Sequence, residues 1–165
     1  MAVFKIEIPR MAELKEAIKG FDKDARPRLK HGLMIFCSTV ADAARLKVPV
    51  QTGRLQTSIT SNVAEEGGVI KGEVGSNVVY APYVELGTGV YGPSGKPIRP
   101  KNKKILAWVS SGARPTTPDG WKKAVLEGRA VFAKEVKGMR PRPFLMPALN
   151  ENINKLVDIL KKELI

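Results

Sequence analysis

The sequence predicts an α+β fold, in which an antiparallel sheet is flanked by a long central helix and a long C-terminal helix. Three observations support this prediction. Apolar residues recur at helical spacing over 29–46 and again over 145–164. Between these stretches, two segments with alternating apolar residues surround Glu-Glu-Gly-Gly at 65–68, which is typical of a β-hairpin. The 165 residues suffice for one hydrophobic core, so we expect a single domain over 1–165.

Two short elements are expected before the central helix. A strand is predicted by alternation at Phe4, Ile6 and Ile8, and Pro9 ends it. A short helix follows, and its apolar residues are Leu14, Ala17, Ile18 and Phe21.

The central helix begins after a break at 24–27, where Asp24 can cap it and Pro27 can sit in its first turn. It continues to Leu46, and Pro49 ends it. Its apolar positions are Leu29, Leu33, Phe36, Cys37, Val40 and Ala44.

The hairpin is predicted from Leu55, Ile59 and Val63 on one face of its first strand. Ile70, Gly72 and Val74 then alternate along the second strand. Residues 129–137 form a weaker strand candidate. After Pro143, apolar residues at helical spacing predict a C-terminal helix of about 20 residues, roughly 30 Å long.

The charge of the chain is concentrated in one stretch. The net charge of +12 and pI near 10.0 favour acidic partners, such as nucleic acid or an acidic protein. Residues 96–142 contain thirteen Lys and Arg but only three acidic residues, and they also hold five of the twelve prolines and both tryptophans. We therefore expect a basic, loop-rich insertion at about 87–128 within the single domain.

Composition also limits the compartment. One Cys permits no internal disulfide, no apolar run reaches the length of a membrane span, and the N-terminal sequence lacks the apolar region of a signal peptide. We therefore expect a protein that folds in the cytoplasm without membrane contact.

The residues that could support catalysis point to structural roles. Cys37 and His31 are six residues apart on one helix, about 240° around it, so they cannot form a dyad. One His and one Cys cannot form a zinc site. The glycines at 87, 89 and 92 have dinucleotide spacing, but Pro93 and Pro97 interrupt the helix that would bind a pyrophosphate. We expect no enzyme activity, no metal and no cofactor.

Three short motifs are distinctive. The first follows the central helix and contains Thr52, Gly53, Arg54 and Leu55. The second contains Tyr80, Tyr83, Glu85, Gly87 and Thr88, and the third, before the C-terminal helix, contains Arg142, Pro143 and Phe144. Gly53 allows an unusual turn conformation, and Thr52 or Gln51 can bond to free backbone groups. Arg54 and Glu85 are plausible ion-pair partners. Each motif by itself is also compatible with turns and helix caps that bind nothing.

In this order, the motifs resemble a family of tailed-bacteriophage proteins similar to gene product ten of phage HK ninety-seven, known as minor tail, tail-completion or head-tail joining proteins. The resemblance spans about 11–165 and includes Pro-Val-x-Thr-Gly at 49–53, Tyr-Ala-x-Tyr-Val-Glu at 80–85 and Arg-Pro-Phe-Leu at 142–145. Gln51 stands where the family usually has Asp, and Leu86 where it usually has Phe.

The resemblance implies a structural virion protein of the neck or tail, assembled in the host cytoplasm. It implies binding to other neck or tail proteins and a homo-oligomeric ring of six copies, because such proteins act where a head meets a six-fold tail. Long loops such as 87–120 would then become ordered only against neighbouring proteins.

A nucleic-acid-binding domain is the alternative. The basic stretch could contact non-specific DNA or an acidic protein through Lys96, Arg99, Lys101, Lys103, Lys104, Lys122 and Lys123. Trp108 or Trp121 could provide stacking platforms for bases. Docking on protein is favoured, because the stretch lacks regular alternation of aromatic and basic residues.

Overall fold

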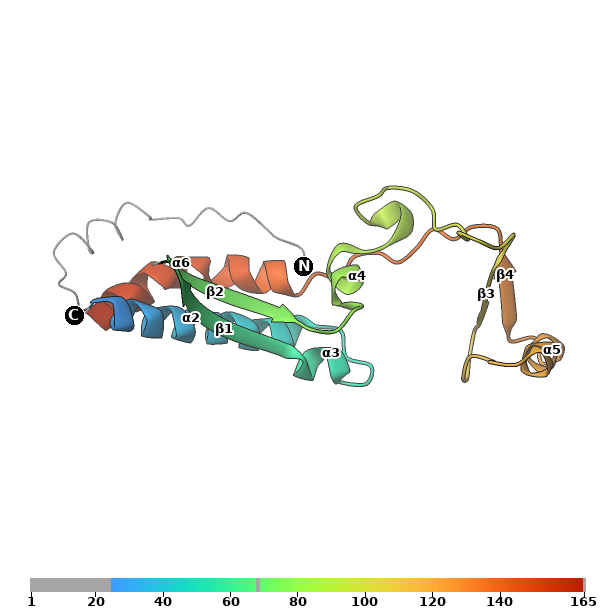
Figure 1. The fold of residues 1–165 in the computed structure, drawn as a ribbon, viewed down its shortest axis with the longest axis horizontal. Coiled ribbons are helices and arrows are strands. Elements are labelled where there is room, and N and C mark those ends of the chain that lie inside the picture. Colours follow the sequence, from blue (N-terminus) through green and yellow to red (C-terminus); the bar gives the residue numbers. More distant parts are fainter. Residues whose placement is uncertain (1–24, 68, 165) are drawn as a thin grey trace. The chain divides into compact units, whose positions relative to one another are not determined.

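The computed structural model describes residues 25–67 and 69–164 of the chain. The predicted strand at 4–8, the helix at 14–21 and the Asp24 cap lie outside these residues. The described elements (Figure 1) are α2 (Ala25–Lys47), α3 (Arg54–Thr57), β1 (Ile59–Glu66), β2 (Val69–Ser76), α4 (Ala81–Leu86), the 3-10 helix η1 (Gly89–Tyr91), β3 (Leu106–Val109), α5 (Pro118–Leu126), β4 (Ala130–Ala133) and α6 (Leu145–Leu164). The predicted α+β class is confirmed, with two small antiparallel sheets in place of one.

The chain divides into two compact units. We call residues 1–85 and 142–165 the body, and residues 86–141 the arm. The arm includes the predicted insertion at 87–128 and continues to residue 141, because the returning strand β4 pairs with β3.

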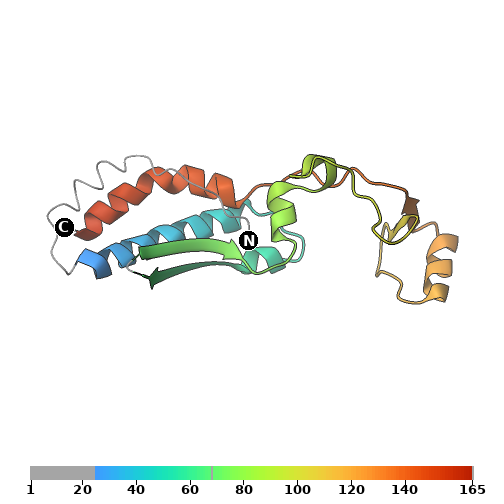
Figure 2. The same cartoon turned by 45° about the horizontal axis from the view of Figure 1, so that its top comes forward.

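In the body, α2 packs against both β1–β2 and α6 (Figure 2). β1 and β2 are antiparallel, with Ile59 opposite Ser76 and Val63 opposite Gly72. The apolar residues of one hairpin face pack with α2, whereas Asn62 and Glu73, a directly opposite pair, are exposed. One covered face and one polar face are typical of an antiparallel sheet.

The core of the body is formed by α2 and α6 together with residues of α3, the β1–β2 hairpin and α4. Phe144, Ile59 and Val157 are the largest side chains that are completely buried. The helices α2 and α6 approach closely at Gly32, where a Cβ would lie 2.9 Å from Cδ2 of Leu160. The 23-residue α2 and the 20-residue α6 confirm the two predicted helices.

The prediction that Leu55 belongs to the first strand is wrong. Leu55 lies in the one-turn helix α3, and β1 begins at Ile59. A spacing of four residues places side chains on one side in a helical turn as well as in a strand, so the pattern did not separate them. Leu55 is buried, as its apolar character predicts.

The arm consists of two antiparallel segments, and α5 lies in the connection between their strands β3 and β4. In β3–β4, Leu106 lies opposite Ala133 and Trp108 opposite Val131, and Ile98 bridges to Val136 nearer the ends of the arm. The predicted strand at 129–137 is therefore four residues long, followed by this bridge. Helix α5 is capped by Thr117, whose Oγ1 accepts a hydrogen bond from the Gly120 amide at 3.2 Å.

The arm has almost no hydrophobic core of its own. Across 86–141, every residue of which the structure describes, Ala124 is the only buried hydrophobic residue. More than a third of the surface is exposed in each of Val90, Tyr91, Ile98, Ile105, Trp108, Val125, Leu126, Phe132 and Met139. The pattern differs sharply from the body and indicates that apolar surface of the arm is available for contacts.

Candidate partner-binding surfaces

The three sequence motifs meet in the core of the body. Leu55 of the first motif, Ala81 next to Tyr80 in the second, and Phe144 of the third belong to the same buried cluster. The main structural role of the motifs is thus to join α3, α4 and the start of α6.

Glu85 connects the second motif to the third. Its side chain is buried, and its carboxylate oxygens accept hydrogen bonds from the backbone amides of Phe144, Leu145 and Met146 at 2.8–2.9 Å. These amides lie at the N-terminus of α6, whose first turn has no acidic residue. A carboxylate there satisfies amides that have no partner within the helix and interacts favourably with the helix dipole.

The predicted Arg54–Glu85 ion pair does not form. Both oxygens of Glu85 bond to α6 amides, and Arg54 is exposed on α3 with no ion-pair partner among the described residues. Sequence reasoning paired opposite charges, but the helix terminus offered the buried carboxylate three donors in fixed positions.

The predicted turn at Gly53 is present. Its φ is 75°, in the left-handed region that favours glycine, and it precedes α3. No side chain caps the N-terminus of α3, so the capping role considered for Thr52 or Gln51 is not observed.

Gly87 and Thr88 belong to the arm, where they pair with its returning segment. The Thr88 amide donates to the Met139 carbonyl at 2.9 Å, and the Met139 amide donates to Thr88 Oγ1 at 2.8 Å. A Cβ at Gly87 would lie 2.8 Å from the same Met139 carbonyl. These two motif residues therefore join the beginning of the arm to its end.

In the body, the backbone amide of Arg142 donates to the carbonyl of Val84 at 2.8 Å. Together with Glu85, this bond fixes the two places where the chain leaves the body and returns to it.

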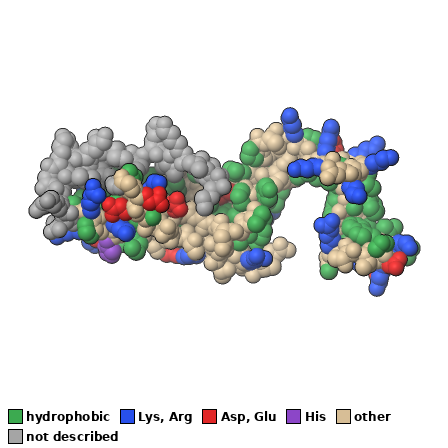
Figure 3. Space-filling model, viewed as in Figure 1, with side chains coloured by type: hydrophobic (Ala, Val, Ile, Leu, Met, Phe, Trp, Pro, Cys, Tyr) green, Lys and Arg blue, Asp and Glu red, His purple; other side chains and the backbone are tan. Residues whose placement is uncertain are grey.

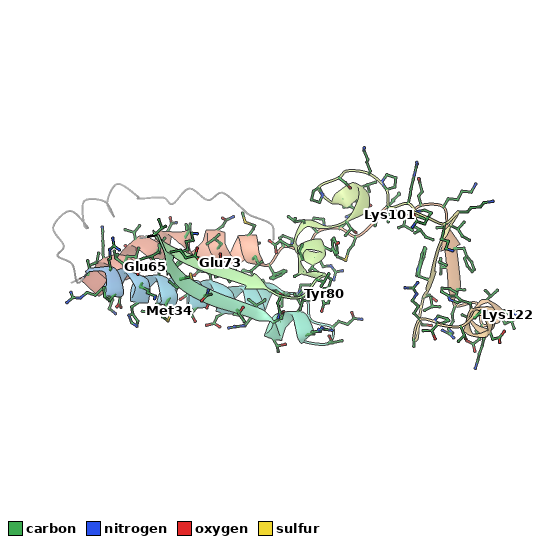
Figure 4. All side chains as sticks on the ribbon, in the orientation of Figure 1. Met34, Glu65, Glu73, Tyr80, Lys101 and Lys122 are labelled. Carbon is green, nitrogen blue, oxygen red and sulfur yellow. The ribbon has the colours of Figure 1, made fainter. Side chains whose placement is uncertain are left out.

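Some motif residues remain on the surface. Tyr80 and Tyr83 are 41% and 55% exposed, and Tyr80 lies at the end of the body that carries α3 and α4 (Figure 4). Their neighbour Val79 is 85% exposed. Arg142 and Pro143 are also exposed, so the motifs combine core residues with a solvent-facing set.

All seven predicted contact lysines and arginines are exposed on the arm, at two places along the chain. Lys122 and Lys123 are on α5 and pair with Asp119 and Glu127 at 3.2 and 3.9 Å. The other five lie at 96–104, and Lys101 and Lys122 both extend into solvent (Figure 4).

Within that segment, Arg99 pairs with Glu135 at 2.8 Å. Lys101, Lys103 and Lys104 have no ion-pair partner among the described residues. Arg99 and Lys104 line a shallow pocket with Lys134 and Glu135.

An apolar groove on the arm was not predicted. It has a volume of about 470 Å³, and its lining includes Ile98, Leu106, Trp108, Val136 and Met139, with Lys137 beside them. Apolar and basic side chains lie next to each other on the arm's surface (Figure 3). The only signal in the sequence was alternation of Leu106 and Trp108, which is too short to identify a strand.

The two tryptophans differ in role. Trp108 is 39% exposed in the groove. Trp121 packs against Phe132, with ring centroids 6.4 Å apart, so part of its ring surface already has a contact within the arm.

The two residues considered for nucleophilic chemistry have structural surroundings. Cys37 is buried in the core, as predicted, and burial raises the pKa of its thiol. His31 is on the surface, and its Nδ1 lies 2.7 Å from Oε2 of Glu163. In the described ranges, no group of His, Cys, Asp and Glu is arranged to hold a metal ion, and no helix is both long and apolar enough to cross a membrane.

Comparison with known proteins gives one family. Residues 8–87 match the family HK97-gp10-like, described as "Bacteriophage HK97-gp10, putative tail-component". The matched residues contain the first motif and the second as far as Gly87, and they stop before most of the arm. No curated protein and no solved structure matches the chain.

Proposed function

We propose that the chain completes the tail or joins it to the head in the virion, because residues 8–87 match the phage tail-related HK97-gp10-like family. It acts through contacts with other neck or tail proteins and between its own copies, in a ring of six. Contacts between unlike surfaces of successive copies would close such a ring.

The arm carries this proposal. A unit of this size normally buries a set of large apolar side chains, yet Ala124 is the only buried hydrophobic residue of the arm, and nine large hydrophobic residues are exposed. Such surface is typical of a segment that is covered in an assembly. The body, by contrast, has a complete core and can hold the arm in each copy.

Binding, not bond-making, is the proposed activity. Cys37 contributes to the core of the body, and His31 forms a surface pair with Glu163. Both residue types that most often serve as nucleophile and base therefore have structural roles in this chain.

Non-specific DNA binding is the second candidate. The arm carries twelve Lys and Arg but three acidic residues, a net charge of +9 out of the chain's +12. The unpaired Lys101, Lys103 and Lys104 could contact phosphates. This activity is compatible with a neck position, where DNA passes through the channel.

Deletion of the gene from a phage that carries it tests the proposal. We expect DNA-filled heads and separate tails to accumulate, and expression of the intact chain from a plasmid to restore joined particles. Joined, infectious particles without the protein would refute the proposal. Cryo-electron microscopy of the restored particles checks the six-fold ring.

The state of the isolated protein gives a second check. Because the arm cannot bury its apolar surface alone, we expect the purified chain to be a monomer or a weak oligomer that forms rings only with its partner. A stable, monodisperse hexamer at micromolar concentration in light scattering would contradict this expectation.

A further inference from the structure

We infer that the apolar groove of the arm is a docking site for an acidic amphipathic segment of a neighbouring neck or tail protein. The identity of the neighbour rests on the proposed function, whereas the chemistry of the segment follows from the groove itself.

The two faces of the β3–β4 sheet have different surroundings. Directly opposite residues share a face, so Ala107 and Phe132 lie on one face and Trp108 and Val131 on the other. Helix α5 packs on part of the first face, where Trp121 contacts Phe132, although Phe132 remains 50% exposed. The second face contributes Leu106 and Trp108 to the lining of the groove.

The groove-lining face continues beyond the strands. Ile98 and Val136, joined by two backbone hydrogen bonds of 2.8 and 3.0 Å, extend the lining toward Met139. Ile98, Trp108 and Met139 are each 38–40% exposed. A partner with apolar side chains along one side can therefore remove a continuous apolar surface from water, which favours association.

The positive charge of the arm determines the polar side of that partner. Lys137 lines the groove, and Lys134, Arg99 and Lys104 line a second pocket of the arm, where Glu135 is the only acidic residue. With the arm at +9, carboxylates flanking the partner's apolar side are the complementary groups.

Two other occupants fit less well. Duplex DNA would contact lysines and arginines through its phosphates but would leave the apolar groove uncovered. A second copy of the arm carries the same net charge of +9 and lacks the complementary carboxylates, so pairing of two arms at the groove is electrostatically unfavourable.

A designed peptide can probe the groove in the full chain. The Trp121→Phe variant keeps an aromatic ring against Phe132 and leaves Trp108 as the only tryptophan. An 18-residue helical peptide with Leu along one side and Glu on the others should shift Trp108 emission to shorter wavelength, with a Kd on the order of 10 µM. Peptides with Lys in place of Glu, or Ser in place of Leu, should bind at least tenfold more weakly.

Matched variants locate the binding. Ile98→Ser with Met139→Ser should weaken binding at least tenfold, whereas Leu126→Ser, at a residue 88% exposed on α5, should change it less than twofold. Lys134→Glu with Lys137→Glu should weaken binding, and the same change at Lys122 and Lys123 should have a smaller effect. Circular dichroism verifies that each variant is folded.

Three results would overturn the inference. The groove variants could bind the Leu-Glu peptide as well as the parent does. A random DNA duplex could shift Trp108 emission and compete with the peptide, which would make the groove part of a DNA site. Emission could instead shift with protein concentration alone, which would identify a second copy as the occupant.

Particle assembly separates this inference from the proposed function. If the groove variants restore joined particles as well as the intact chain does, the docking inference fails while the proposed function stands. If deletion of the gene leaves particles normal, the proposed function fails whatever the peptide does.

Discussion

Gly72 of β2 lies directly against Cys37 of α2. A Cβ at position 72 would be 2.6 Å from the Cys37 Sγ and 3.1 Å from Cγ of Leu33, so the hairpin can lie this close to the helix only with glycine. At Gly75, three residues further along β2, a Cβ would have no other atom within 4 Å.

Gly72→Ala should therefore lower the free energy of unfolding by about 1–3 kcal/mol through overpacking. Gly75→Ala should be neutral or stabilising by up to about 1 kcal/mol, because Ala restricts the unfolded chain. Urea unfolding followed by circular dichroism measures both. A Gly72→Ala/Cys37→Ala double variant should be more stable than the sum of the single effects predicts; strict additivity would show that the two residues do not limit each other.

Replacement of Glu85 tests the link between α4 and α6. Glu85→Ala should lower the free energy of unfolding by about 2–3 kcal/mol, because it leaves three amides at the start of α6 without their acceptor. Glu151→Ala is the control, since Glu151 is an exposed residue of α6 that pairs with Lys47 and should cost less than about 1 kcal/mol. Equal urea midpoints for the two variants would contradict a capping role for Glu85.

The left-handed conformation of Gly53 makes its own prediction. Gly53→Val should lower the free energy of unfolding by about 1–3 kcal/mol through backbone strain. A Cβ at this position would meet no other atom within 4 Å, so steric overlap does not contribute to the cost. Gly53→Asn should cost less, because Asn tolerates the left-handed region better than a β-branched residue does. Thermal melting distinguishes the two variants. A Val variant with the same melting temperature as the parent would contradict the left-handed conformation of Gly53.

The raised pKa of Cys37 predicts how stability depends on pH. The unfolded thiol ionises near its ordinary value of 9.0, whereas the buried thiol keeps its proton to higher pH. The contribution is thus present below pH 9 and is lost as the pH rises from about 9 through the folded pKa. Cys37→Ala should show a shallower loss of stability across that alkaline range. Equal slopes for the parent and Cys37→Ala would be inconsistent with this burial effect.

Access to Cys37 gives a second readout. Thiol reagents should modify the native protein at pH 8 much more slowly than the urea-unfolded protein, because the residue is 4% exposed. Comparable rates in both states would mean that the core around α2 opens freely.

Salt dependence separates the two readings of the basic residues. If they dock on protein, as we expect, binding to random duplex DNA should be weak, and Lys101→Ala/Lys103→Ala/Lys104→Ala should impair particle joining. If they bind DNA, affinity should fall with salt with a log-log slope of roughly −0.9 per phosphate neutralised. The triple variant should then reduce that slope by up to about 3. Tight, salt-sensitive DNA binding that this variant loses, with joining intact, would reverse our expectation.

The sequence by itself determined the long regular elements of the body. Helices α2 and α6 were predicted almost to their ends, because each repeats its apolar spacing over several turns. The hairpin was predicted from its turn and alternation, and the unusual turn conformation at Gly53 from the conformational freedom of glycine. The motifs also indicated the phage family that residues 8–87 match. All of these signals are local in the chain.

Only the tertiary structure decided which distant groups meet. The partner of Glu85 lies about sixty residues away, and opposite charge suggested Arg54, whereas helix-terminal amides offered more hydrogen bonds. Leu55 became helical because one turn fits between Gly53 and Ile59. The groove of the arm arises where β3, β4 and the Ile98 bridge come together, whereas α5 contacts the opposite face through Trp121 and Phe132. Which face of a short sheet is buried depends on the elements that pack against it, so the residue spacing along a four-residue strand could not predict the groove.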